Sequence, residues 1–167
     1  MTHRIRPALP ADVRGIDALV QPLATEQILL GKDMVAYYEA VQEFLVAVDE
    51  ETGELVGCGA LHVMWEDLGE VRTLAARADQ RGRGVGHALL EALLERARAL
   101  GLSRVFCLTF EVGFFERHGF EVMADDGVDP SIYMELLRSV DAGVAEFLDL
   151  ARVKPNTLGN TRMIRHL

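Results

Sequence analysis

Residues 68–100 read LGEVRTLAARADQRGRGVGHALLEALLERARAL, and this stretch decides the fold. An apolar run predicts a strand at residues 71–76, a glycine-rich segment follows at residues 81–86, and an amphipathic run then predicts a helix. Three glycines within five residues allow a tight turn and a close approach to a ligand, because glycine carries no Cβ. The first amides of a helix lack internal acceptors and lie at the positive end of its dipole. We therefore expect this corner to bind a phosphate or a pyrophosphate.

The segments around this corner predict a mixed sheet. Residues 44–48 and 55–64 read as two strands joined by a polar turn, which indicates a hairpin, and residues 104–110 (RVFCLTF) read as a buried strand. Gly57 and Gly59 lie inside a predicted strand, where glycine usually marks a bulge or a close backbone neighbour. Pro22 is expected to end a first helix, and residues 144–150 are expected to form a strand. We predict an α/β fold, in the sense of a mixed α+β sheet flanked by helices, as a single domain over residues 1–167.

Composition excludes several classes of protein. Half of the 167 residues are hydrophobic and the formal net charge is −9, so a soluble acidic domain is expected and a nucleic-acid partner is not. The sequence shows no signal-peptide pattern and no stretch of roughly 18 apolar residues, so we expect a cytoplasmic protein without a membrane contact. Cys58 and Cys107 lie in apolar runs without metal-site spacing, and we expect buried free thiols and no metal.

The glycine segment lacks the G-x-G-x-x-G order of a dinucleotide fingerprint and the Gly-Lys-Ser/Thr of a P-loop. It matches R/Q-x-x-G-x-G/A through Arg81, Gly84 and Gly86, and so resembles the acetyl-coenzyme A (acetyl-CoA) signature of the GNAT N-acetyltransferases. The order of elements over residues 4–123 is similar to that family as well. The resemblance implies a GNAT acyl-CoA N-acyltransferase fold, acetyl-CoA as co-substrate, and direct attack by a deprotonated amine without an acyl-enzyme.

The resemblance also implies where acetyl-CoA binds. Backbone amides of the loop would hold its pyrophosphate, and the strand before the loop would pair with its pantetheine arm and polarise the thioester carbonyl. The residues implied for binding are Leu74, Ala75, Ala76, Arg81, Gly82, Arg83, Gly84, Val85, Gly86 and His87, with Thr73 among the catalytic residues. Many GNAT enzymes carry a tyrosine acid in the short helix after the fifth strand. This sequence has Phe115 there, so the usual acid is missing.

A narrower resemblance covers nearly the whole chain. The runs GCGALH (residues 57–62), LGEVRT (residues 68–73) and VKPNTLGNTRM (residues 153–163) are similar to the short actinobacterial N-acetylglutamate synthases, which acetylate L-glutamate in the first step of arginine biosynthesis. Longer synthases carry an amino-acid-kinase domain that binds arginine, and we expect that domain to be absent here. L-Arginine is therefore expected, if it inhibits, to act on the acetyltransferase domain itself.

An anionic substrate requires fixed cations or amide donors. The resemblance implies that the short apolar segment ending at Lys32 contacts glutamate. It also implies that Thr161 and Arg162 match a Ser/Thr-Lys/Arg pair of the C-terminal strand. Arg72 and Lys154 are further candidates. For each cation the alternative is a solvated surface charge with weak ion pairs.

Two residues qualify as the base that deprotonates the amine. His62 ends a strand, and imidazole titrates in the useful range. Glu70 begins the fourth strand, where several GNAT enzymes place a carboxylate. The alternatives are a hydrogen-bonded core histidine and a structural glutamate. His87, just after the glycines, is expected to serve the phosphate site.

Three functions remain open on the sequence alone. The first is acetyl-CoA:L-glutamate N-acetyltransferase, and the second is a GNAT enzyme for another amino acid such as glutamine. The third is a non-catalytic sensor of acetyl-CoA or arginine. A homodimer is expected, because GNAT domains often pair and the apolar C-terminal strand could be shared.

Overall fold

A computed structural model describes residues 2–29, 31–124, 128–148 and 159–167. The chain divides into two compact units, which are described separately. Unit 1 holds Met1–His62 and Val71–Leu100, and unit 2 holds Val63–Glu70 and Gly101–Leu167.

The sheet of unit 1 has the order β1 (His3–Pro7), β2 (Phe44–Asp49), β3 (Leu55–Val63) and β4 (Leu68–Ala76, whose residues from Val71 belong to this unit). β1 pairs with β2, and β2 with β3, in antiparallel register. Phe44 lies opposite Ala60, so residues just before β2 come close to the end of β3. The hairpin expected over residues 44–64 is thereby confirmed.

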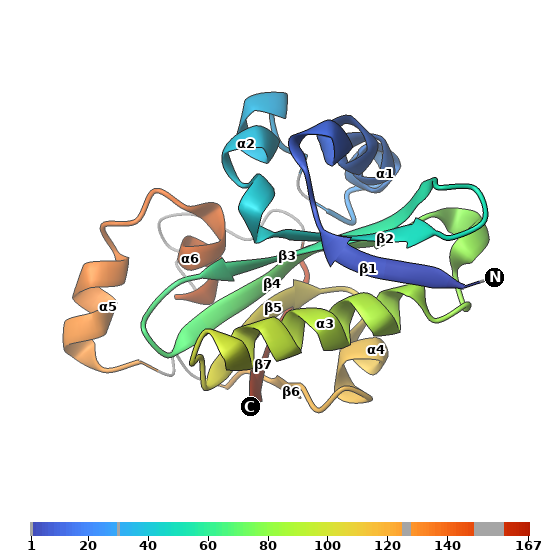
Figure 1. Cartoon of the computed structure of the whole chain (residues 1–167). Coiled ribbons are helices and arrows are strands. Elements are labelled where there is room, and N and C mark those ends of the chain that lie inside the picture. Colours follow the sequence, from blue (N-terminus) through green and yellow to red (C-terminus); the bar gives the residue numbers. More distant parts are fainter. Residues whose placement is uncertain (1, 30, 125–127, 149–158) are drawn as a thin grey trace. The chain divides into compact units, whose positions relative to one another are not determined.

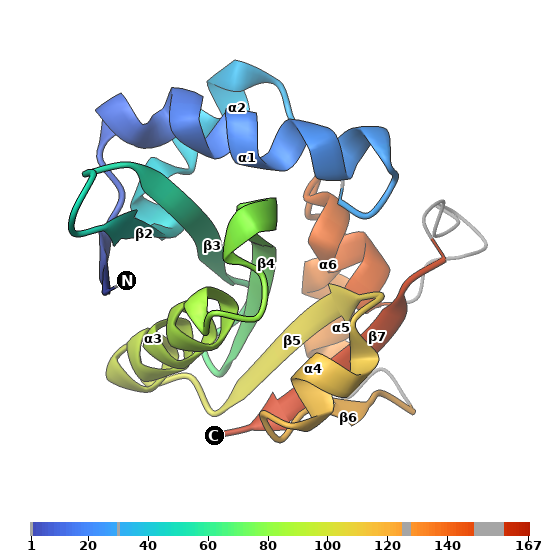
Figure 2. The ribbon, with the colours of Figure 1, turned by 90° about the vertical axis from the view of Figure 1, so that its right-hand side faces the viewer.

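Helices cover both faces of this sheet. α1 (Val13–Thr25) and α2 (Met34–Glu39) lie on one face and α3 (Val85–Ala99) on the other (Figures 1 and 2). Alternate side chains of β2 and β3 reach α1 and α2, in a cluster of Val13, Ile16, Val20, Tyr37, Phe44, Val46, Cys58 and Ala60. On the other face a Cβ at Gly57 would lie 2.7 Å from Val85 Cγ1, and one at Gly59 would lie 2.9 Å from Leu93 Cδ1. The two glycines therefore admit side chains of α3 close to the strand.

Unit 2 contains three antiparallel strands in the order β5 (Arg104–Thr109), β7 (Thr161–His166) and β6 (Glu121–Val122). Its helices are α4 (Val112–Glu116), α5 (Pro130–Leu136) and α6 (Ala142–Phe147). α6 packs on β5 through the rings of Phe147 and Phe106, whose centroids lie 5.1 Å apart (Figure 2 shows α6 above β5 and β7). Short 3-10 turns occupy Pro10–Asp12, Val41–Glu43 and Ala78–Gln80.

Two local predictions were wrong. The strand expected at residues 144–150 is replaced by α6 over Ala142–Phe147, because the Asp141 carboxylate accepts the amides of Gly143 (2.8 Å) and Val144 (3.1 Å) and so caps a helix. Pro22 does not end α1. The Glu26 amide still donates to the Pro22 carbonyl (3.1 Å), because a proline in the last turn removes only the one bond that its own nitrogen would make.

Among the described residues no helix combines the length and the apolar character that a membrane crossing requires.

Candidate active site

The glycine segment forms an open cradle at the start of α3. Gly82 and Gly84 have φ values of 77° and 84°, and a Cβ at either would meet no atom within 4 Å. Gly84 is the N-cap of α3, and the first intrahelical bond of this turn runs from the Ala88 amide to the Gly84 carbonyl (2.9 Å). Helix geometry therefore leaves the amides of Val85 and Gly86 without an intrahelical acceptor, at the positive end of the helix dipole. This geometry fits a diphosphate.

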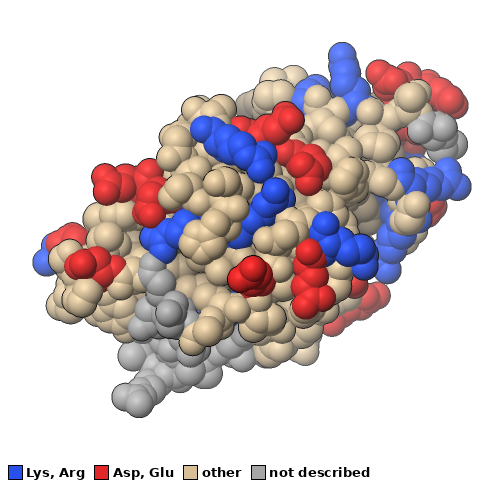
Figure 3. Space-filling view, turned by 90° about the horizontal axis from the view of Figure 1, so that it is seen from below, with Lys and Arg blue, Asp and Glu red and all other residues tan. Residues whose placement is uncertain are grey.

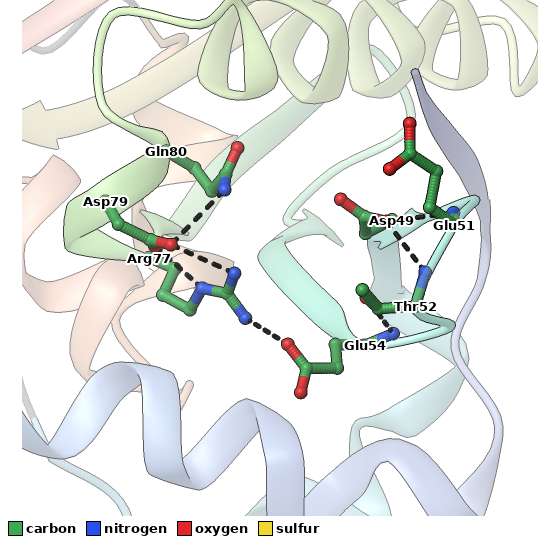
Figure 4. Close-up of polar contacts among 7 residues, drawn as sticks. All are labelled: Asp49, Glu51, Thr52, Glu54, Arg77, Asp79 and Gln80. Carbon is green, nitrogen blue, oxygen red and sulfur yellow. Dashed lines mark hydrogen bonds and ion pairs between the residues drawn. The ribbon is translucent and has the colours of Figure 1, made fainter. Parts of the chain in front are cut away.

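The approach to the cradle is held by an ion-pair network in which Arg77 is the centre (Figure 4). Its guanidinium donates to both carboxylate oxygens of Asp79 (2.7 and 3.0 Å) and to Glu54 (2.7 Å). The hydrogen bond from Arg77 holds the pKa of the Asp79 carboxyl below its usual range. A depressed carboxyl pKa means that the network persists at neutral pH and is lost as pH falls through the folded-state pKa. Exposed pairs add little stability, so the network mainly fixes the position of the loop.

The cations of the loop are exposed. Arg81 and Arg83 alternate with Gly82 and Gly84, and His87 lies in the first turn of α3. In the face shown in Figure 3, basic and acidic side chains are interspersed rather than gathered by sign. The chain as a whole has a net charge of −9, which repels anions. The local positive charges of the loop are therefore needed where an anion binds.

β4 is distorted at Thr73, which the resemblance places among the catalytic residues. Thr73 is 9% exposed and has a φ of 55°, which is rare for a non-glycine residue and costs on the order of 1–3 kcal/mol. The Cys58 thiol on β3 donates to the Thr73 carbonyl (3.7 Å). Leu74, the next residue, points toward Gly59 on the α3 face, and Ala75 belongs to the cluster beneath α1 and α2. A positive φ inside a strand interrupts its regular geometry at this residue.

His62 forms a hydrogen-bonded pair with Glu43. His62 Nδ1 lies 2.7 Å from Glu43 Oε1, and the two side chains are 25% and 28% exposed. Glu43 ends the turn before β2, and the register of the β2–β3 hairpin brings it to the end of β3. The sequence analysis did not single out Glu43, although a hairpin over residues 44–64 places the residue before its first strand near the end of its second strand.

Glu70 lies in unit 2 with only 4% of its surface exposed. Burial, and then the charge of Glu70, raise the pKa of the Cys107 thiol, so the carboxylate lies within electrostatic range of β5. Phe115, at the position of the family's tyrosine, packs against the rings of Phe114 and Phe120 at centroid distances of 5.2 and 5.1 Å. An apolar cluster thus occupies the place where the usual acid would stand.

The predicted cations occupy different elements. Lys32 is half-buried between α1 and α2, and Arg72 is half-buried on β4. Arg162 on β7 donates Nη2 to the Phe147 carbonyl at the end of α6 and contacts Met123 Sδ at 3.8 Å. Thr161 begins β7 opposite Thr109. Lys154 lies outside the described residues.

The two thiols are predicted to be inert. Burial raises the pKa of Cys58 to about 12 and raises that of Cys107 well above its ordinary value. Thiolate is the reactive form, so neither residue should be alkylated by iodoacetamide at pH 8 in the native protein. Both should be alkylated in denaturant, as read by mass spectrometry. Rapid native alkylation of either would contradict the burial and would reopen a covalent route.

Comparison with known proteins decides the family. Residues 20–120 match the model of the acetyltransferase (GNAT) family. The chain belongs to this family. An amino-acid acetyltransferase of Mycobacterium tuberculosis is 53% identical over 161 residues, which cover 96% of this chain and 92% of that protein. One of Neisseria meningitidis is 35% identical over 73% of this chain, which spans 28% of that longer protein.

Solved GNAT structures agree with the fold. The M. tuberculosis protein Rv2747, in complex with CoA and NLQ, superposes with a TM-score of 0.93 at 52% identity, covering 98% of this chain and 99% of that one. The N-acetylglutamate synthase of Neisseria gonorrhoeae, in complex with CoA and N-acetyl-glutamate, superposes with a TM-score of 0.80 at 27% identity over the whole of this chain and 35% of that one. The predicted GNAT fold and acetyltransferase class are confirmed, whereas the residue roles stay predictions.

Proposed function

We propose that the protein transfers the acetyl group of acetyl-CoA to the α-amine of L-glutamate, giving N-acetyl-L-glutamate and CoA. The observation that carries the proposal is the 53% identity to an amino-acid acetyltransferase over nearly the full length of both chains. The open cradle at Gly82 and Gly84, which fits the diphosphate of CoA, supports the cofactor. The complex of the N. gonorrhoeae synthase with N-acetyl-glutamate supports the substrate.

The chain's own residues supply two functions in this reaction. Acetyl-CoA brings an activated acetyl group as a thioester. His62 accepts a proton from the α-ammonium, so that the amine can form the new C–N bond as the C–S bond breaks. Amides of β4 around the strained Thr73 donate to the thioester oxygen, where negative charge develops. The nitrogen loses its second proton as the amide forms, and the leaving thiolate takes up that proton directly or through solvent, so no acid is required at Phe115.

Substrate selection is assigned to the cations. Lys32, Arg72, Lys154 and Arg162, with the hydroxyl of Thr161, are proposed to bind the two carboxylates of glutamate. Glutamine differs from glutamate only in a neutral side-chain amide, so the charge at the side-chain subsite decides between them.

A thiol-release assay with a panel of amino acids tests the proposal. Glutamate should give the highest kcat/KM, well above glutamine and above amino acids without a second carboxylate. A higher kcat/KM for glutamine than for glutamate would identify glutamine as the preferred substrate. Absence of release with every amino acid, together with tight acetyl-CoA binding by calorimetry, would indicate a sensor instead.

Glu70→Gln decides which residue takes the proton. The substitution keeps the shape of this buried side chain but removes its basicity. With His62 as the base, kcat should stay within about tenfold of the wild-type value, whereas loss of a general base costs about 10²–10⁴-fold. A loss in that larger range for Glu70→Gln, with His62→Ala nearly fully active, would transfer the role to Glu70.

Regulation, assembly and location complete the proposal. Inhibition by L-arginine stays a prediction, because this chain matches only 33% of the N. gonorrhoeae synthase that has been solved in complex with CoA and L-arginine, and initial rates with added arginine would test it. A single domain over residues 1–167, a homodimer, a cytoplasmic location and a role in arginine biosynthesis stay predictions. Analytical ultracentrifugation would test the dimer.

A further inference from the structure

We propose that Glu43 is a positioning residue for His62, and that Arg96 fixes the turn that carries Glu43. In this arrangement the carboxylate holds the imidazole in one tautomer, with Nε2 as the basic nitrogen. The inference rests on the proposed function for the role of His62, but its geometry stands independently in unit 1.

The first step concerns the proton between the two side chains. Glu43 Oε1 lies 2.7 Å from His62 Nδ1. An ionised carboxylate only accepts hydrogen bonds, so Nδ1 must carry the proton and donate it. A neutral imidazole has one N–H, and Nε2 therefore carries the lone pair. The other tautomer would direct a lone pair of Nδ1 at the carboxylate and is disfavoured by charge repulsion.

The second step concerns the position of the carboxylate. Glu43 is the last residue of the turn Val41–Glu43, and its amide donates to the Ala40 carbonyl (2.9 Å). From α3, the Arg96 guanidinium donates to the carbonyls of Gln42 (2.5 Å) and Glu43 (3.3 Å). The planar fork of arginine suits two neighbouring acceptors, so one side chain fixes two successive peptide units. The backbone of Glu43 is thus tied on both sides before its carboxylate meets His62.

The third step concerns what this arrangement does for the reaction. A quarter of the His62 side chain is exposed, so the ring is reachable while its Nδ1 edge is held. The α-ammonium passes its proton to Nε2, and the imidazolium that results is compensated by the Glu43 carboxylate. The proton leaves to solvent in the next cycle, so the step needs no further reactant. Glu43→Gln keeps the shape of the side chain and a hydrogen-bond partner for the ring, so the loss of the carboxylate charge should affect turnover more than folding.

Nitrogen NMR of the full chain tests the tautomer directly. In ¹⁵N-labelled protein the ring signals of His62, assigned by their absence in His62→Ala, should show a protonated Nδ1 and an unprotonated Nε2 at a pH where the ring is neutral. In Glu43→Gln the preference should weaken, because an amide can either accept from or donate to the ring. A wild-type ring with its proton on Nε2 would overturn the inference.

Kinetics test the functional half of the inference. Glu43→Gln should lower kcat by about 10- to 100-fold, a part of the full general-base contribution, with the KM for acetyl-CoA unchanged. Adding Glu43→Gln to His62→Ala should cost nothing further, because the two act as one unit. Additive losses would show that Glu43 acts without His62. Arg96→Lys, which keeps the charge but loses the fork, should give a smaller loss of kcat, whereas Arg98→Lys, an exposed residue on the same helix, should give none.

The two proposals fail in different ways. If no amino acid is acetylated, the proposed function fails. The NMR measurement of the His62 tautomer still tests the pairing with Glu43 in that case. If glutamate is acetylated but the double variant shows additive losses, the positioning role fails and the function stands.

Discussion

Gly84→Glu is expected to abolish acetyl-CoA binding. Gly84 caps α3 with a φ of 84°, in the left-handed region where a side chain costs roughly 1–2 kcal/mol, although a Cβ there meets no atom within 4 Å. The larger effect is electrostatic. A carboxylate placed at the start of the helix would compete with the diphosphate for the same amides and would repel its charge. Calorimetric titration with CoA should show no measurable binding.

Two variants separate strain from charge. Gly84→Ala introduces the unfavourable backbone conformation without the carboxylate, so CoA affinity should fall by about tenfold rather than disappear, in line with a conformational cost near 1.4 kcal/mol. Gly101→Glu places the same side chain at a glycine with a φ of 82° and equally open space, just after the C-terminal end of α3. α3 has 15 residues and is therefore about 22 Å long, so this variant should bind CoA normally. Unchanged affinity in Gly84→Glu would remove the loop from the CoA site.

The loop and its helix could be predicted because their information is local. The spacing of apolar residues predicted α3, and the glycines predicted a tight turn, which the structure forms with positive φ at Gly82 and Gly84. Gly57 and Gly59 predicted a close neighbour, which proved to be α3. The prediction failed where a short apolar run satisfied two patterns. Residues 144–150 read as a strand, but Asp141 caps a helix in front of them.

The site was less predictable because its contacts join distant parts of the chain. Glu43 meets His62 across 19 residues, and Arg96 meets the carbonyl of Gln42 across 54, so no local spacing reveals either. The positive φ of Thr73 has no signal in its own residue type, because threonine rarely adopts this conformation. Conversely, Phe115 could be read from the sequence as a missing acid, and its packing among Phe114 and Phe120 agrees with an apolar role.

Arg162→Ala is expected to raise the KM for glutamate by about 100-fold, while the KM for acetyl-CoA changes by less than about threefold. A hydrogen bond to a charged group contributes roughly 1.5–3 kcal/mol, and 1.4 kcal/mol corresponds to a factor of ten. Arg162 is proposed to bind a carboxylate of glutamate, and the acetyl-CoA cradle is formed by other residues. Steady-state kinetics with each substrate varied in turn would measure both constants. Equal increases in both would remove Arg162 from the substrate site.

The control must allow for the structural bond that Arg162 makes to the Phe147 carbonyl. Arg165 is a matched residue, because it also lies on β7 and donates to a backbone carbonyl, that of His118 (2.5 Å), from the opposite face of the strand. Arg165→Ala should therefore lower the thermal midpoint to a similar extent as Arg162→Ala and leave the KM for glutamate unchanged. If the KM for glutamate rises in both Arg162→Ala and Arg165→Ala, the cause is a less stable β7 rather than the loss of a substrate contact.

The same variant identifies which carboxylate Arg162 binds. If it binds the side-chain carboxylate, Arg162→Ala should lose most of the preference for glutamate over glutamine, because the charge that separates the two substrates would have no partner. If it binds the α-carboxylate, kcat/KM should fall equally for both substrates, since both carry that group. We expect the first result, because Arg162 is the charged member of the Thr161–Arg162 pair that the resemblance implies for the glutamate site. Comparison of kcat/KM for the two amino acids in wild-type and variant protein decides between them.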